Sequence, residues 1–179
     1  MALIVEDGSG KSDAESYVSV SDCVSYAAAR GLTFPAEPAA NAEAALRRGT
    51  SWLDGAYRGS FPGRRKNGRA QALEWPRMDA WDNSRPPDPI RDDEIPVEIV
   101  HACCEAAIRE LAAPGSLSPD VTPGQIEKRI KVEGIEIEYA IGAGTVAEQR
   151  PVVSIIDDIL SSLIAIRRGA VLFGTAARS

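Results

Sequence analysis

The sequence predicts a mainly α-helical protein: a small four-helix bundle with one β-hairpin (about residues 125–140), a long central loop, and extended N- and C-terminal arms. Three observations predict this fold. Four segments place apolar residues at steps of three and four, one segment alternates apolar and charged residues, and residues 58–94 hold many of the prolines and glycines without a sustained period. At 179 residues, the chain suits one domain, residues 1–166, and a C-terminal tail, residues 167–179.

The first half of the domain contains an arm, two helices and the central loop. Residues 1–16 mix a short apolar run with Gly, Ser and Asp, which predicts an extended arm. Ser19 or Ser21 can cap a first helix that ends at Gly31. Asn41 caps a second helix, whose apolar stripe is Ala45, Leu46, Gly49, Leu53 and Tyr57, widened by Trp52. Residues 58–94 then form a loop that begins basic and ends acidic, and loops of such length are often functional.

Two further helices complete the predicted bundle. A third helix starts at Pro96 and runs to about Ala112, and its predicted buried stripe is Val100, Cys103, Cys104, Ala107, Ile108 and Leu111. Pro151 opens a fourth, whose apolar face is Val152, Ile155, Ile156, Ile159, Leu160, Leu163 and Ile166. Arg167 and Arg168 suit the negative end of its dipole.

The hairpin has the clearest strand pattern in the chain. Apolar and charged residues alternate on both sides of Glu133-Gly134. A two-residue turn there pairs Val132 with Ile135 and Lys131 with Glu136, then Ile130 with Ile137 and Arg129 with Glu138. One face is then apolar, and the other sets opposite charges across from each other, so pattern and charge predict one register.

Composition narrows the function classes. The net charge of −6 argues against a phosphate-binding surface over the whole molecule, although local patches remain open. The odd count of three cysteines, two of them adjacent, predicts reduced thiols and synthesis in a reducing cytoplasm. The sequence shows no signal-peptide pattern and no run of transmembrane length, so we expect no membrane association.

The residues that could carry chemistry fail on spacing or context. "GSGKS", residues 8–12, lacks the first glycine of a phosphate loop and a helix directly after the lysine, which favours a flexible arm. His101 has Cys104 and Glu105 at helical spacing, but both cysteines of that helix fall on the core stripe. Asp157 and Asp158 are adjacent on a helix and point apart. We therefore expect no enzymatic activity, no cofactor and no metal.

Two segments remain as candidate binding sites. The basic start of the central loop, near Phe61, Trp75 and Trp81, combines positive charge with aromatics, as single-strand binders do. For base stacking, a solvated or acid-paired loop is the preferred interpretation. Contact with a phosphate backbone or an acidic protein surface stays open. Its basic residues are Arg58, Arg64, Arg65, Lys66 and Arg69.

The C-terminal tail is the second of these segments. An apolar run follows Arg167 and Arg168, and an apolar segment outside the core favours a docking peptide over one that folds back on its own domain. This run is Val171, Leu172 and Phe173.

The order of five motifs resembles a phage family from about Ser16 to the fourth helix. These motifs are "SYVSVSD", "AALRRGTSWLDGAYRG", "ALEWPR", "DEIPVEIVHACCEAA" and "IKVEGIEIEY". Members are often labelled DnaT-like single-stranded-DNA-binding proteins, and they are similar to the head–tail adaptor (connector, head-completion) proteins of long-tailed phages. The resemblance places Trp52, Leu53, Tyr57 and the stretch Glu74 to Arg77 in the family's recurring pattern, where we interpret them as scaffold.

The resemblance implies a structural virion protein, made in the host cytoplasm and located in the neck. It implies a homo-oligomeric ring, dodecameric in the family, that joins the portal protein to the next neck or tail-completion protein and extends the DNA channel, with non-specific contact to packaged DNA. The alternative is a single-stranded-DNA-binding protein that acts in replication.

Overall fold

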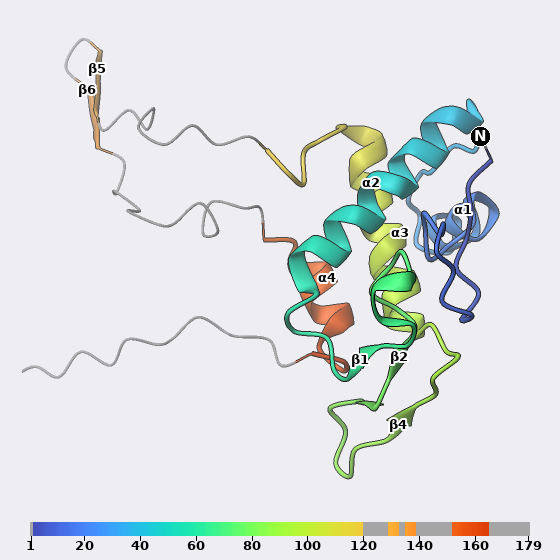
Figure 1. Ribbon diagram of the computed structural model, residues 1–179. Helices are drawn as coiled ribbons and strands as arrows, with labels where there is room; N and C mark the ends of the chain where they lie inside the picture. The colour runs from blue at the N-terminus through green and yellow to red at the C-terminus, as the bar shows by residue number, and fades with distance from the viewer. Residues whose placement is uncertain (1, 120–128, 133–134, 139–151, 165–179) are drawn as a thin grey trace, which may run out of the picture.

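Helices α2 and α3 form the centre of the molecule. The computed structural model describes residues 2–119, 129–132, 135–138 and 152–164 (Figure 1). In order, its helices are α1 (Val20–Ala29), α2 (Ala39–Tyr57), α3 (Val97–Ala112) and α4 (Ser154–Leu160). Helix α2 crosses α3 and packs against it, and both α1 and α4 also pack against α3. The predicted, mostly helical fold with four helices is confirmed for the described residues.

The predicted N-cap is correct for α1 and wrong for α2. Ser19 caps α1 as predicted, because its hydroxyl accepts a hydrogen bond from the Asp22 N–H at 3.1 Å. The predicted Asn41 cap is wrong: α2 begins at Ala39, directly after Pro38. The Pro38 carbonyl accepts the N–H of Asn41 at 2.9 Å, so the backbone is already helical where the cap was expected. A proline has a φ suited to a helix start, which favours the earlier position.

The buried face of α3 is rotated from the predicted stripe. Cys103, Cys104 and Ala107 are buried as predicted, but Val100, Ile108 and Leu111 are only partly buried. Because α1, α2 and α4 all pack on α3, the buried face is broad enough to include two glutamates. The additional buried residues are Ile99, Ala102, Glu105, Ala106 and Glu110.

Helix α4 is shorter and more exposed at its start than predicted. It covers Ser154–Leu160 and is followed by turns up to residue 164. Ile156, Leu160 and Leu163 are buried, but Val152 is 81% exposed and Ile155 is 41% exposed. The predicted end of this helix and the docking tail lie outside the described residues.

The hairpin adopts the predicted register. Strands β5 (Arg129–Val132) and β6 (Ile135–Glu138) pair antiparallel, with Arg129 opposite Glu138 and Val132 opposite Ile135. Because a shift of one residue would exchange the faces of a strand, this match confirms the prediction from alternation and charge.

Residues 58–94 are not the structureless loop that was predicted. They contain β1 (Arg64–Arg65), β2 (Arg77–Met78), β3 (Ala80–Trp81) and β4 (Pro89–Ile90), with a short 3-10 helix, η1 (Gly68–Ala70). β1 pairs with β2 and β3 with β4, both antiparallel. Trp75, which is fully buried, joins this segment to the core, and its Nε1 has no hydrogen-bond partner among the described residues. The strands are too short to show a period in the sequence.

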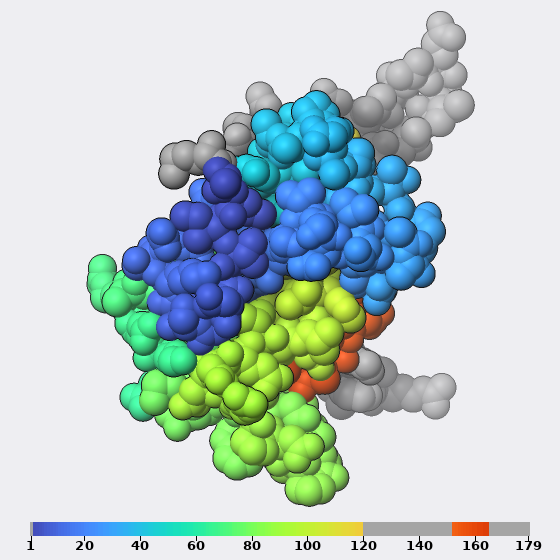
Figure 2. Space-filling model, turned by 90° about the vertical axis from the view of Figure 1, so that its right-hand side faces the viewer, coloured from blue at the N-terminus to red at the C-terminus, as the bar shows by residue number. Residues whose placement is uncertain are grey.

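The N-terminal arm lies against the body instead of extending from it. Figure 2 shows this segment, in dark blue, between the first helix and the central loop. Val5 and Ser16 form a β-bridge, and Tyr17 and Val18 are buried in the core. The predicted extended arm is therefore wrong for residues 2–16, because their apolar side chains and backbone hydrogen bonds are satisfied within the same chain.

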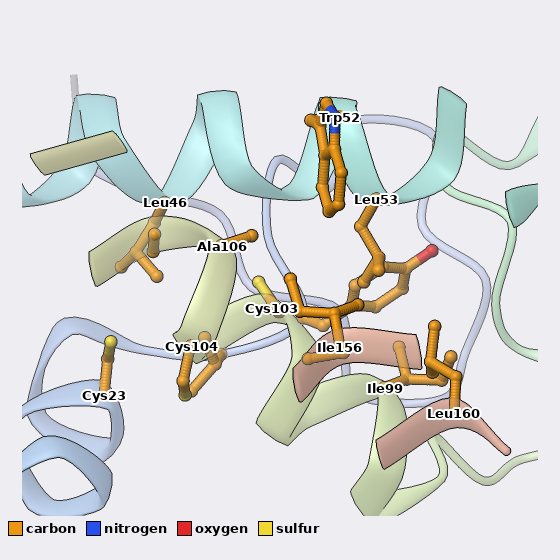
Figure 3. Close-up of a cluster of buried hydrophobic side chains, with 14 of the residues drawn as sticks. Cys23, Leu46, Trp52, Leu53, Ile99, Cys103, Cys104, Ala106, Ile156 and Leu160 are labelled. Carbon is orange, nitrogen blue, oxygen red and sulfur yellow. The ribbon is translucent and has the colours of Figure 1, made fainter. Parts of the chain in front are cut away.

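The three cysteines are buried free thiols, as predicted. Cys103 and Cys104 face the interior from α3 (Figure 3), and Cys23 is also fully buried. Burial raises the pKa of Cys103 to about 12. A buried thiol that stays protonated is a poor nucleophile. The role of these cysteines in the described structure is therefore to pack in the core. Within the described residues, no helix has both the length and the apolar character to cross a membrane.

Candidate nucleic-acid interface

The basic residues of the central loop surround one hollow. Four of the five predicted residues line it, and it has a volume of about 510 Å³. The fifth, Arg58, lies outside it at the end of α2, beside Glu74. We refer to this site as the basic hollow; its lining is Arg64, Arg65, Lys66, Gly68, Arg69 and Met78.

Arg77 holds the chain that forms one wall of the basic hollow. Its side chain is 8% exposed, and its Nε and Nη2 donate hydrogen bonds to the carbonyls of Pro62 (2.6 Å) and Gly63 (2.8 Å). The adjacent strand pairing places Arg65 opposite Arg77. Gly63 has a φ of +65°, and a Cβ there would overlap the Met78 carbonyl, so only glycine fits this close approach.

Gln71 and Asn67 connect the hollow to the N-terminal arm. Gln71, 2% exposed, accepts the Asn67 N–H at 2.9 Å and donates to the Pro76 carbonyl at 3.1 Å. The Asn67 side chain donates to the carbonyl of Gly10 at 3.0 Å, and Lys66 Nζ donates to that of Gly8 at 3.2 Å. The backbone of residues 62–71 is therefore fixed from several sides.

These positioning residues were not identified from the sequence. Arg77 belongs to the stretch interpreted as scaffold, and it is buried, but its hydrogen bonds to residues 62 and 63 follow from no sequence pattern. Gln71 and Asn67 belong to no recognisable sequence pattern, although they bond to each other, because the arm that Asn67 also contacts lies far away in the sequence. A buried glutamine in a polar loop is recognisable only once its burial is known.

Acidic neighbours neutralise part of the basic cluster. The Glu74 carboxylate lies 3.0 Å from Arg77, 3.9 Å from Arg58 and 4.0 Å from Arg65. Arg64 pairs with Asp79 at 3.2 Å. The acid-paired interpretation is thus correct for three of the five predicted residues. No acid lies within ion-pair distance of Lys66 or Arg69 in the described part of the chain.

A buried hydrogen-bond network formed by Tyr17 and Asp54 fixes the backbone at Glu74. The Tyr17 hydroxyl donates to Asp54 at 2.6 Å and accepts the N–H groups of Glu74 (3.0 Å) and Trp75 (3.1 Å). Asp54 also accepts the Glu74 N–H at 3.0 Å. Burial raises the pKa of Asp54 to about 6 despite these hydrogen bonds. The start of the "EWPR" stretch is therefore anchored to α2.

The aromatic residues do not form a stacking surface at the basic hollow. Trp75 is fully buried and Phe61 is 7% exposed, and the two rings pack against each other with centroids 5.9 Å apart. Of the three tryptophans, Trp81 alone is exposed, at 52%, and it does not line the basic hollow. Phe61 and Trp75 are therefore core residues, and neither presents a ring face on which a base could stack.

The "GSGK" turn binds a carboxylate of its own chain. Glu6 is 4% exposed and accepts the N–H groups of Gly8 (3.0 Å), Gly10 (2.9 Å) and Lys11 (2.9 Å). Gly8 and Gly10 have φ values of +93° and +78°, which turn these N–H groups inward. The anion-binding geometry that the motif resembles is therefore filled by Glu6.

The remaining chemical candidates have structural partners. His101 packs against Tyr26 with ring centroids 4.9 Å apart and ring planes tilted by 45°, and partial burial lowers the pKa of His101. Glu105 accepts from Tyr26 at 3.0 Å and pairs with Arg109 at 2.7 Å. Asp157, expected to be solvated, accepts the Tyr57 hydroxyl at 2.5 Å. No group of three metal-ligating side chains occurs among the residues that the structure describes.

A family model matches residues 1–178 of this chain, and its description is "Putative DnaT-like ssDNA binding protein". The comparisons with curated proteins and with solved structures found no match.

Proposed function

We infer that this chain, which belongs to the family of DnaT-like ssDNA-binding proteins, binds single-stranded DNA through the basic hollow. The observation that carries this proposal is the convergence of four cationic side chains on one site of a chain whose net charge is −6. A local cation cluster attracts phosphates when the rest of the surface does not. The hydrogen bonds of Arg77 and Gln71 fix its backbone, which lowers the entropic cost of binding.

Lys66 and Arg69 supply the cleanest test, because no acid of the described residues lies within ion-pair distance of either side chain. We expect the double variant Lys66→Ala/Arg69→Ala to bind a fluorescent oligonucleotide at least about tenfold more weakly at low salt. If both residues contact phosphates, the slope of log K against log salt should fall by about 1.4, since each contact contributes about 0.7 on a single strand. Fluorescence anisotropy over a salt titration measures both quantities.

The double variant Arg30→Ala/Arg85→Ala is the matched control. It removes the same charge from exposed positions that do not line the hollow. If the control loses as much affinity as the test variant, the attraction is a general charge effect and the hollow is not the site. If the wild-type chain does not bind at low salt, the proposed function is wrong.

A second candidate is the head–tail adaptor ring that joins the portal to the next neck protein in a virion. The exposed start of α4 favours it, because Val152 and Ile155 present apolar side chains to solvent. Exposed apolar surface of this kind is commonly covered in an assembly. In this proposal, the tail residues Arg167 to Ser179 dock on the portal protein, and the basic hollow makes weak contact with packaged DNA.

Removal of the tail tests the adaptor proposal. We expect a chain without residues 169–179 to keep the circular dichroism spectrum of the full chain but to lose attachment to the portal, as seen by electron microscopy of the mixture. The triple variant Val171→Ser/Leu172→Ser/Phe173→Ser should have the same effect if the apolar run is responsible. Normal virion assembly with the truncated chain would contradict docking through the tail.

A further inference from the structure

The positive charges of the basic hollow are clustered at one point and are not spaced along a groove that could follow a DNA strand. Its cationic side chains come from a single turn of chain, residues 64–69, and converge on one concave site. A strand that binds along its length needs cations spaced like its phosphates, each of which carries one negative charge. A terminal phosphate monoester instead carries about −1.5 to −2 at pH 7 and three strong acceptor oxygens. The arrangement fits the monoester better.

The walls of the hollow also lack the groups that would bind bases. Strand-tracking sites combine cations with exposed aromatic rings. Here Phe61 and Trp75 are buried, and the one non-polar side chain in the lining is that of Met78. Gly68 leaves its part of the lining without a side chain, and a Cβ there would contact nothing within 4 Å. The site is thus open to a compact anion and provides no platform for stacking.

The ion pairs at the rim can open for such an anion. The side chains of Arg64 and Asp79 are 71% and 73% exposed, and Arg65 lies 4.0 Å from Glu74. An exposed pair such as Arg64–Asp79 contributes little to stability, so a doubly charged phosphate can compete with Asp79 for Arg64. Arg69 has no acidic partner to exchange among the described residues, and Lys66 has only its hydrogen bond to the Gly8 carbonyl to give up. Arginines are suited to bidentate contacts with the oxygens of one phosphate.

We propose that the basic hollow binds the phosphate monoester at the end of a DNA strand. This proposal rests on the proposed function, and it names the part of the strand that the hollow recognises. It predicts that binding depends on a terminal phosphate more than on strand length or base sequence.

Oligonucleotides of one sequence and length test the proposal, with a 5′-phosphate, a 3′-phosphate or hydroxyls at both ends. We expect either phosphorylated strand to bind the full chain about tenfold more tightly than the unphosphorylated strand, the factor that one further charge-assisted hydrogen bond contributes. The preference should be lost in Lys66→Ala/Arg69→Ala and kept in Arg30→Ala/Arg85→Ala. It should also grow as the pH rises through about 6, where the monoester gains its second charge.

The other outcomes separate this inference from the proposed function. Equal binding of all three strands would overturn the end preference and leave DNA binding intact. Failure of every strand to bind at low salt would overturn both. Displacement of the phosphorylated strand by inorganic phosphate at equal concentration would show that the free ion, and not a strand end, is the ligand, and would also overturn the inference.

Discussion

Replacement of Glu6 by alanine is expected to lower the free energy of unfolding by about 3 kcal/mol. The carboxylate accepts the N–H groups of Gly8, Gly10 and Lys11 while it is 4% exposed. Alanine would leave these donors without partners, and those of Gly8 and Gly10 are buried. Each unsatisfied buried donor costs about 1–3 kcal/mol, reduced here by any water that enters. Urea denaturation followed by circular dichroism measures the change.

Asp7→Ala is the control for this prediction. Asp7 is the adjacent carboxylate, but its ion pair with Lys11 is on the surface, where Asp7 is 60% exposed. We expect its removal to lower the free energy of unfolding far less than the removal of Glu6, because exposed ion pairs contribute little. Equal effects of the two substitutions would contradict the assignment of Glu6 as the anion that organises the turn.

Replacement of Gly49 by alanine is expected to destabilise the chain by about 2 kcal/mol. Gly49 lies on α2 where it crosses α3, and a Cβ there would come within 2.8 Å of the Ala107 nitrogen and 3.1 Å of the Ala106 carbonyl carbon. The contacted atoms are backbone atoms of a helix, which cannot move aside singly. Overpacking of a close-packed interface typically costs about 1–3 kcal/mol, because the two helices must separate.

Gly55→Ala on the same helix should have the opposite sign. A Cβ at Gly55 meets nothing within 4 Å. Alanine should therefore stabilise α2 by about 0.5–1 kcal/mol through its higher helix propensity. Thermal and urea unfolding of the two variants and the wild type measures both effects: the steric cost at Gly49 and the gain in helix propensity at Gly55. A stabilising Gly49→Ala would show that α2 and α3 are less closely packed than the structure indicates.

The features predicted correctly depend on neighbours in the sequence. The hairpin register follows from alternation and opposite charges within ten residues, and the Ser19 cap follows from a hydroxyl three residues before the N–H that it accepts. The core positions of Cys103 and Cys104 follow from helical spacing alone. Short-range patterns of this kind reflect energies that act before the chain is folded.

Apart from the Asn41 cap, which fails for a local reason, the incorrect predictions involve partners outside the segment concerned. The N-terminal segment was expected to extend, but it is held by Lys66 and Asn67. Residues 58–94 were expected to be irregular, but Tyr17, Asp54 and the buried Arg77 order them. The buried face of α3 differs from the predicted stripe because three helices pack against α3. None of these contacts has a sequence period, since the contributing segments meet only in the folded chain.

The sequence by itself determined the helical class, the hairpin register, the buried thiols and the identity of the basic residues. Local spacing and charge are sufficient for these, because each depends on residues within a few positions of one another. Only the tertiary structure decided that four of those basic residues line one hollow, that Glu6 fills the "GSGK" turn and that Phe61 and Trp75 are core residues. The physical reason is that burial, ion pairing and preorganised hydrogen bonds are properties of segments brought together by folding.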